Sequence, residues 1–432
     1  MKPQPLGLET SMLAQPRVLR LMAVSSLLVP VPIIAYYMFR AVGFVEGTCE
    51  DLVTLLVMLP LGGPHVVATF SRTFFDPAFR RRERAWVIGS MVLWAGVFTT
   101  AVLSVGTSVR WLGHVPMSLL LTGFFFWASL HILQQNLFCL ERCAPDRDAA
   151  TDRRFVWLER CVVLASLYPM AFFRMAMVSG DGTAASNPHA LETRLVESVA
   201  GSELAAGYAF RIGRAIPVLP EFMKGPHIWG AAALIFFSAV VLYAREARRR
   251  SREGTLSSAR LGFVAISAAV GFVVPFFPNL DSAFQGINAW HCFQYLVMVF
   301  VLNREAQAAG KPQMGLVAAL SKEGAHLRFY LAMLAATIGA MLVMFTVAYL
   351  LTLAAPGRFR LFGFDDSEIP IDPATGLPAY RPGAVLSAYY LFGFGGLLVH
   401  YLQDTFVILP RGMGGLASLL GSGSRHRNPA AA

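Results

Sequence analysis

The chain has 432 residues, of which 56% are hydrophobic and only 14% are charged, and its formal net charge is +10. Soluble domains are about 45–50% apolar and about 25% charged, so this composition excludes a disordered chain, a disulfide-dense secreted module and most water-soluble enzymes. It predicts a polytopic membrane protein.

A helix that crosses a bilayer needs about 20 mostly apolar residues. The chain contains ten such stretches, which we number as spans 1 to 10 in chain order. They are roughly Val18–Arg40, Asp51–Phe70, Ala85–Leu103, Ser118–Leu140, Phe155–Val178, His227–Tyr243, Leu261–Pro278, Ser282–Val301, Phe329–Leu353 and Ala384–Pro410. The expected fold is therefore all-α: a polytopic integral membrane helical bundle of about ten transmembrane helices, forming a single domain over residues 1–410.

The basic residues indicate the orientation of these spans. If the N-terminus is cytoplasmic, 25 of the 36 Lys and Arg residues fall in the two ends and in the connections after even-numbered spans. This positive-inside bias predicts that both ends are cytoplasmic, and the expected location is the bacterial inner membrane. The basic residues are spread over separate short loops with no accompanying fold motif, so nucleic acid is not an expected partner.

Three segments outside the spans stand out. Two connections on the outer side are long, at about 179–225 and 357–383, and long loops are often functional lids or tolerated insertions. Residues 411–432 are rich in Gly, Ser and Ala. They are expected to form a disordered cytoplasmic tail.

Four of the nine histidines lie inside spans: His65 in span 2, His131 in span 4, His291 in span 8 and His400 in span 10. All four spans run in the same direction, so depth in the membrane can be compared directly. At a rise of about 1.5 Å per residue, His131, His291 and His400 lie roughly 16–20 Å from the inner ends of their spans. The sequence therefore predicts one layer of histidines near the middle of the membrane.

Polar residues recur after these histidines at helical spacing. Three of the histidines have glutamine three residues later, which lies on the same helix face: these are Gln134, Gln294 and Gln403. His65 departs from this repeat because Ala68 takes the corresponding place. The fourth position after each histidine is also polar, and holds Thr69, Gln135, Tyr295 and Asp404.

This pattern favours a metal site. Imidazole suits iron, copper, zinc and nickel, and a ligating histidine donates its other ring N–H to a supporting acceptor. The predicted ligands are His65, His131, His291 and His400. The predicted supporting residues are Gln134, Gln294, Gln403 and Asp404, and Asp404 is also a candidate carboxylate ligand. Non-haem iron is the expected metal, because no evident Glu general base accompanies the histidines for zinc-dependent hydrolysis.

The segment Leu61-Gly62-Gly63-Pro64-His65 is similar to the Gly-x-Pro-His that opens a motif of the Brp/Blh-type family of His-rich membrane carotenoid oxygenases. That family is thought to hold iron with histidines. This chain continues with Val66-Val67-Ala68-Thr69, where the family has Gly and then an acidic residue with a further His, and it has more spans. The resemblance implies metal-dependent oxidation of a hydrophobic substrate, without implying cleavage of carotene.

The expected function is that of an oxygenase, hydroxylase or desaturase. Its substrate would be a lipid or isoprenoid that enters from the membrane, and an electron donor or co-substrate would be a further partner. The simplest structural alternative is that the histidines and glutamines are interhelical hydrogen-bonding groups.

Three other functions remain open from the sequence. One is a membrane electron-transfer protein in which a pair of histidines holds haem b. Another is a transporter or proton relay that uses buried ionisable groups such as Arg174 and Asp404. The last is a lipid-linked glycosyl or acyl transferase, whose acidic candidates are Glu46, Glu50 and Asp51.

Overall fold

The computed structural model describes residues 16–44, 46–106, 116–143, 153–176, 225–277, 279–310, 313–354 and 393–405. These residues form helices and the turns between them, with no strand among them. The all-α prediction is confirmed for this part of the chain. The predicted tail and the predicted outer loops, apart from residue 225, lie outside it.

Each predicted span contains helical structure over those of its residues that the structure describes. Spans 1 to 5 appear as α1 (Pro16–Val24), η3 (Ser25–Leu28) and α2 (Pro30–Ala41); α3 (Glu46–Val57), η4 (Met58–Gly62) and α4 (Gly63–Arg72); α6 (Arg84–Gly106); α7 (Pro116–Cys143); and α8 (Arg153–Ala165) with α9 (Tyr168–Ala176). Spans 6 to 10 appear as α12 (Pro226–Arg252); α13 (Ser258–Val273) with η7 (Val274–Phe276); α14 (Leu280–Ala308); α16 (His326–Ala354); and α18 (Phe394–Gln403). Two short helices, α5 (Pro77–Arg82) and α15 (Gly315–Leu320), lie in connections.

Within the described residues, six helical stretches are long and apolar enough to cross a membrane. They are Arg17–Ala41, Cys49–Arg72, Arg154–Phe173, Pro226–Arg252, Ser258–Phe276 and His326–Val347. Large apolar side chains point outward from these stretches, with Leu234 on α12 70% exposed and Val343 on α16 64% exposed. These features are consistent with an integral membrane protein, while the count of ten spans and their orientation stay predictions.

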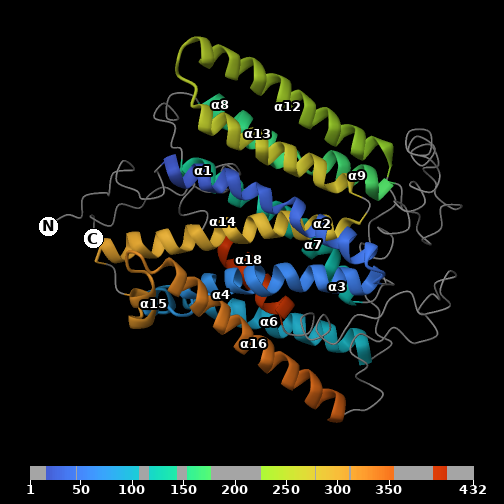
Figure 1. The fold of residues 1–432 in the computed structure, drawn as a ribbon, viewed down its shortest axis with the longest axis vertical. Coiled ribbons are helices and arrows are strands. Elements are labelled where there is room, and N and C mark those ends of the chain that lie inside the picture. The colour runs from blue at the N-terminus through green and yellow to red at the C-terminus, as the bar shows by residue number, and fades with distance from the viewer. Residues whose placement is uncertain are drawn as a thin grey trace, which may run out of the picture.

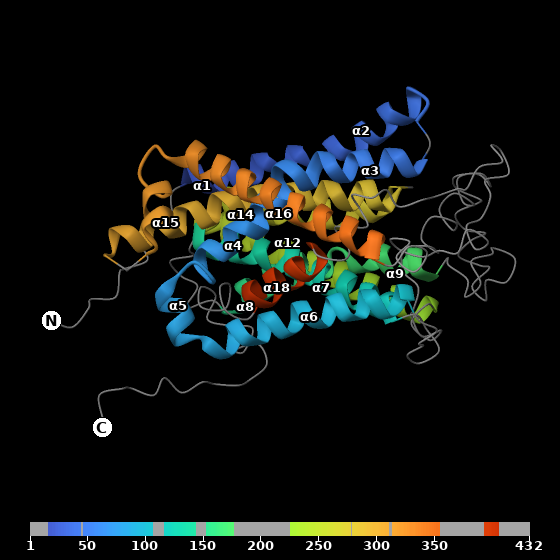
Figure 2. The same cartoon turned by 90° about the horizontal axis from the view of Figure 1, so that it is seen from below.

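The helices run roughly alongside one another as a bundle (Figures 1 and 2). Helix α14 passes through the middle, with α12 and α13 on one side of it and α4 and α16 on the other (Figure 1). It contacts α2, α3, α4, α7 and α16. Its first turn is capped by Asn279, whose side chain accepts a hydrogen bond from the Ser282 backbone N–H at 2.8 Å, which satisfies one of the free N–H groups at a helix start.

Two glycines allow close packing of the helices that carry His65 and His400. A Cβ atom at Gly63 on α4 would lie 2.1 Å from Cγ2 of Thr337 on α16. A Cβ atom at Gly395 on α18 would lie 1.8 Å from Cδ1 of Trp94 on α6. Only a residue without a side chain fits at such distances, so these glycines fix how α4 and α18 approach their neighbours. Just before Gly63, η4 is a π-helical segment, a feature often found near functional sites.

Candidate metal centre

Four helices enclose the candidate site. Helix α14 contacts α4 and α7, and α18 contacts the same two helices, so the four close into a ring. Each contributes one histidine: His65 from α4, His131 from α7, His291 from α14 and His400 from α18. All four side chains are fully buried, and one ring nitrogen from each lies within 4.8 Å of the others. The structure thus brings all four predicted ligands together.

The spacing of these nitrogens suits one shared ion. Two nitrogens bound to a single metal ion at about 2.1 Å are at most about 4.2 Å apart. The nitrogens of a tetrahedral site lie closer, at about 3.4 Å. The observed spread of up to 4.8 Å therefore means that the rings would draw together when they bind one ion. The buried His cluster is able to hold one metal ion.

The hydrogen bonds of His65 define which of its ring nitrogens carries the proton. Its Nδ1 lies 2.9 Å from the Gly62 carbonyl oxygen. A carbonyl oxygen only accepts, so Nδ1 must be the donor. In a neutral ring, Nε2 is then left with a lone pair. That Nε2 points at Nε2 of His400, 2.7 Å away.

The proton on His400 follows from a directed chain of hydrogen bonds. With Asp404 as a carboxylate, the Tyr295 hydroxyl donates to its Oδ1 at 2.6 Å. The Thr69 hydroxyl then donates to the Tyr295 oxygen at 2.8 Å. The Thr69 oxygen in turn accepts a hydrogen bond from His400 Nδ1 at 2.6 Å. The Nε2 atom of His400 therefore also presents a lone pair, since a neutral imidazole has one N–H.

Two lone pairs thus face each other at the contact between His65 and His400. Their repulsion is relieved when a cation lies between them, either a proton or a metal ion. The two other histidines bear on this choice, because neither ring nitrogen of His131 or of His291 has a hydrogen-bond partner among the described residues. A buried polar group without a partner costs about 1–3 kcal/mol.

Asp404 places a carboxylate against the cluster. It directly follows α18 and is fully buried. Its Oδ2 lies 3.4 Å from His400 Nδ1 and 3.9 Å from His131 Nε2. The predicted link between Asp404 and the histidines is therefore present in the geometry. Arg174, the other partner considered for Asp404, has its side chain outside the described residues.

The predicted glutamines make their hydrogen bonds elsewhere. Gln294 donates to the Met22 carbonyl oxygen at 3.4 Å, and Gln403 donates to the Ser90 hydroxyl at 3.0 Å. For Gln134, Oε1 is buried without a partner among the residues that the structure describes. A supporting role for these three glutamines stays a prediction. The neighbouring Gln135 bonds to the His291 backbone oxygen at 2.9 Å.

The residues that support the histidines are those at the fourth position. Thr69, Tyr295 and Asp404 each follow a histidine by four residues and bond to one another or to His400. The sequence contained this signal, because all four of these positions are polar. The Gly62 carbonyl that orients His65 had no signal in the side-chain pattern, since it belongs to the backbone.

The acidic residues of the first outer loop lie away from this centre. Glu50 is on α3 and accepts a hydrogen bond from the Asn279 side chain at 2.7 Å. It precedes His65 by fifteen residues, or about 22 Å of helix. Asp51 is the next residue on α3, while the side chain of Glu46 falls outside the described part of the chain. The carboxylates of Glu50 and Asp51 therefore do not share the His cluster.

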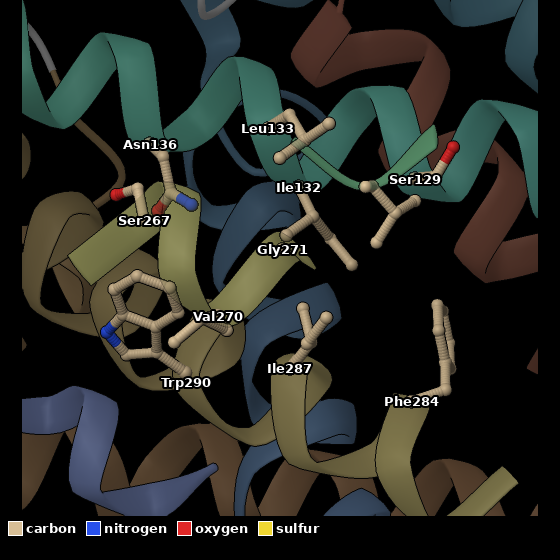
Figure 3. Close-up of a pocket in the computed structure, with 11 residues that line it drawn as sticks. Ser129, Ile132, Leu133, Asn136, Ser267, Val270, Gly271, Phe284, Ile287 and Trp290 are labelled. Carbon is tan, nitrogen blue, oxygen red and sulfur yellow. The ribbon is translucent and has the colours of Figure 1, made fainter. Parts of the chain in front are cut away.

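A small cavity lies beside the cluster, between α7, α13 and α14 (Figure 3). It is lined by chain neighbours of two ligands, with Ile132 and Leu133 next to His131 and Trp290 next to His291, but by none of the four histidines. Its volume of about 40 Å³ exceeds the roughly 10–15 Å³ that a water molecule needs. A cavity of this size holds water or dioxygen, and it is too small for an isoprenoid chain.

Replacing Tyr295 with phenylalanine tests the supporting chain. The change removes the donor to Asp404 and the acceptor for Thr69, and we expect metal affinity or activity to fall about 10–100-fold, as for other supporting residues of metal sites. The measurements are metal affinity by competition with a chelator and the optical or paramagnetic spectrum of the bound metal. Tyr37→Phe is the control, because it removes an exposed hydroxyl on α2, away from the histidines. Equal behaviour of the two variants would rule out the role given to Tyr295.

Comparison with protein-family models, with curated proteins and with solved structures finds no match for this chain.

Proposed function

We propose that this protein is a metal-dependent oxidoreductase embedded in the bacterial inner membrane, acting as an oxygenase, hydroxylase or desaturase on a lipid or isoprenoid. The ligands are His65, His131, His291 and His400, and the metal is non-haem iron. This extends the resemblance of the His65 segment to the Brp/Blh-type membrane carotenoid oxygenases. An electron donor or co-substrate is a further partner, because such oxidations need a source of electrons or an oxidant.

One observation carries the proposal: each histidine has at least one ring nitrogen without a hydrogen-bond partner that fits it. His65 Nε2 and His400 Nε2 face each other, and no ring nitrogen of His131 or His291 has a partner among the described residues. A proton shared between His65 and His400 would relieve the contact of their lone pairs at 2.7 Å. That shared proton would still leave both ring nitrogens of His131 and both of His291 without a hydrogen-bond partner among the described residues. A single metal ion satisfies one nitrogen of all four rings. The metal reading is therefore favoured over a proton relay or simple interhelical hydrogen bonding.

The donor set favours redox chemistry over hydrolysis. Four imidazoles and one nearby carboxylate suit iron or copper as well as zinc. Hydrolysis by zinc calls for a general base near the metal-bound water. The one carboxylate beside the histidines among the described residues is that of Asp404. Its Oδ1 accepts from Tyr295 at 2.6 Å and its Oδ2 lies 3.4 Å from His400 Nδ1, the ring nitrogen opposite the Nε2 that would face the ion. When bound, an iron ion would supply activation of dioxygen for oxidation of an apolar substrate.

The protein groups around the ion have separate tasks. The Gly62 carbonyl and the Thr69 hydroxyl fix the orientation of His65 and His400. Tyr401 packs its ring against His131, with centroids 4.4 Å apart, and helps to exclude water. Tyr295 holds a proton at its hydroxyl between Asp404 and Thr69, where it is placed to exchange that proton with the cluster.

The packing of the rings weighs against haem b as the alternative cofactor. A haem with two histidine ligands needs them on opposite faces of a porphyrin plane. The four imidazoles instead pack mainly edge to face, with centroids from 4.2 Å for His65–His400 to 6.4 Å for His291–His400. A porphyrin held between His291 and His400 would therefore overlap His65 and His131, whose ring centroids lie 4.2–5.1 Å from those of both. Optical spectra separate the two cofactors, because only haem gives a Soret band.

The function is tested by comparing membrane lipids from cells that produce the parent protein or His131→Ala. We expect lipid or isoprenoid species in the parent that have gained one oxygen atom or lost two hydrogen atoms, and we expect them to be absent with His131→Ala. Mass spectrometry of total lipid extracts makes the measurement across all lipid classes at once. His326→Ala, at an exposed histidine on α16, should match the parent. Identical lipid profiles for all three strains would refute the proposed oxidation.

A further inference from the structure

A second feature lies apart from the His cluster, at the edge of the bundle where α12 runs (Figure 1). An open groove of about 430 Å³ lies between α8, α12 and α13. Its walls include Val162 on α8, Phe236 and Ala247 on α12, and Val264 and Ala268 on α13. Tyr243 provides the one polar group among its lining residues. The size and apolar walls suit a hydrocarbon chain.

One end of this groove is polar. Tyr243 stacks on Phe155, with ring centroids 5.3 Å apart, and the guanidinium of Arg250 lies 4.1 Å above the same Phe155 ring. Arg250 follows Tyr243 by seven residues, or two helical turns, so both project from the same face of α12. Tyr243 and Arg250 thus meet around Phe155 at the point where the apolar walls end.

The hydroxyl of Tyr243 points to a ligand at this end. Its residue is only 7% exposed, and the oxygen has no hydrogen-bond partner among the described residues. Buried tyrosine hydroxyls usually find a partner. A polar group of a bound molecule at the end of the groove would provide one.

Basic residues outnumber acidic ones at this end of α12. Arg260 and Glu159 form a buried pair at 2.5 Å. Arg250 lies 3.8 Å from Glu246, and Arg249 also pairs closely with that carboxylate. The last turns of α12 carry five arginines, Arg245, Arg248, Arg249, Arg250 and Arg252, against two carboxylates, Glu246 and Glu253. The excess of positive charge matches an anionic group, and basic clusters at the end of a membrane helix attract anionic lipids.

We propose that this groove is a binding site for an anionic phospholipid. One acyl chain lies between α12 and α13 against Val162, and the phosphate group accepts hydrogen bonds from the Tyr243 hydroxyl and the Arg250 guanidinium. The large apolar side chains on the outer face of α12, such as Ile235 and Phe237, would face the surrounding lipid, from which this molecule enters. The site does not depend on the function proposed for the His cluster.

The test measures lipid bound to the purified full-length protein by native mass spectrometry, after exchange into micelles with phosphatidylglycerol or phosphatidylcholine. We expect about one phosphatidylglycerol per chain to be retained and phosphatidylcholine to be bound at least about 10-fold more weakly. The phosphates of the two lipids are alike, but the choline ammonium adds a positive charge beside the arginines, each of which contributes about 1 kcal/mol to the attraction of a net anionic lipid. Equal retention of the two lipids would overturn the proposal, because the choice of an anionic head group rests on the positive charge at Arg250.

Variants separate the head-group end from the chain end. Arg250→Gln is expected to weaken phosphatidylglycerol binding at least about 10-fold, and Tyr243→Phe about 3–10-fold. Ala268→Leu fills the groove and should also displace the lipid. Arg328→Gln, at an exposed arginine on α16 outside the groove, is the control and should bind like the parent. Each variant is used only if its thermal unfolding matches the parent. If Arg328→Gln lowers binding as much as Arg250→Gln, the attraction is a general surface effect and the site is refuted.

Discussion

Replacing His400 with alanine is expected to lower the affinity for the bound metal by at least about 100-fold. Loss of a supporting residue already costs about 10–100-fold at metal sites, and this change removes a ligand itself. It also removes the partner of His65 Nε2 at 2.7 Å and the donor to Thr69 at 2.6 Å. Metal content after dialysis against a chelator, measured by mass spectrometry of the element, gives the result.

His326→Ala is the matched control for this experiment. His326 begins α16, is exposed and packs its ring near Phe300 at 6.4 Å, so its loss should leave the metal content unchanged. His65→Ala, His131→Ala and His291→Ala should all resemble His400→Ala, because the ion is shared. If His400→Ala retains full metal content while folding normally, the four histidines do not form the metal site.

The second large effect is expected at the buried pair between Glu159 on α8 and Arg260 on α13. Their side chains are 1% and 4% exposed, and the arginine donates to both carboxylate oxygens over 2.5–3.0 Å. Glu159→Gln leaves the arginine charge buried without its counter-charge. Breaking one side of a buried pair destabilises a protein by about 3–5 kcal/mol. Thermal unfolding in detergent should show a clear fall in Tm.

A comparison within the same protein calibrates this result. Arg160 and Glu141 join α8 to α7 over 2.7 Å, with side chains 21% and 18% exposed. Because water still reaches this pair, Glu141→Gln is expected to cost no more than about 1 kcal/mol. Equal changes in Tm for Glu141→Gln and Glu159→Gln would mean that burial does not set the strength of the Glu159–Arg260 pair.

Much of the site could be predicted because depth in a membrane is a one-dimensional quantity. Hydropathy placed the spans, and the distance from each histidine to the basic end of its span gave the depth of His131, His291 and His400. Polar residues at a common depth in membrane helices usually face the bundle interior, and there they lie close to one another. The convergence of four histidines within 4.8 Å agrees with that reasoning.

The supporting residues could not be chosen from spacing alone. Positions three and four residues after a histidine both lie near its helix face, so Gln403 and Asp404 were equally placed by the pattern. Which one meets the cluster depends on neighbouring helices. Ser90 on α6 takes the hydrogen bond of Gln403, while Tyr295 on α14 bonds to Asp404. These pairings join residues that lie far apart in the sequence. The residue pattern of one helix contains no information about which residues of a neighbouring helix face it.

The groove beside α12 could not be predicted from the sequence pattern either. Tyr243 and the arginines after it read as the end of a membrane span followed by the basic residues of a cytoplasmic loop. Only the packing of α8 against α12 shows that Arg250 is buried at 5% exposure over the Phe155 ring. The two neighbouring arginines, Arg248 and Arg249, remain exposed.

The central claim is that the four histidines bind one metal ion, and X-ray absorption spectroscopy of the purified protein tests it most directly. The energy of the absorption edge identifies the element, and the fine structure gives its neighbours. We expect an iron edge, nitrogen neighbours at about 2.0–2.2 Å and the multiple scattering that imidazole rings produce, all lost in His400→Ala. A protein that contains no stoichiometric metal, or a metal without imidazole scattering, would contradict the account.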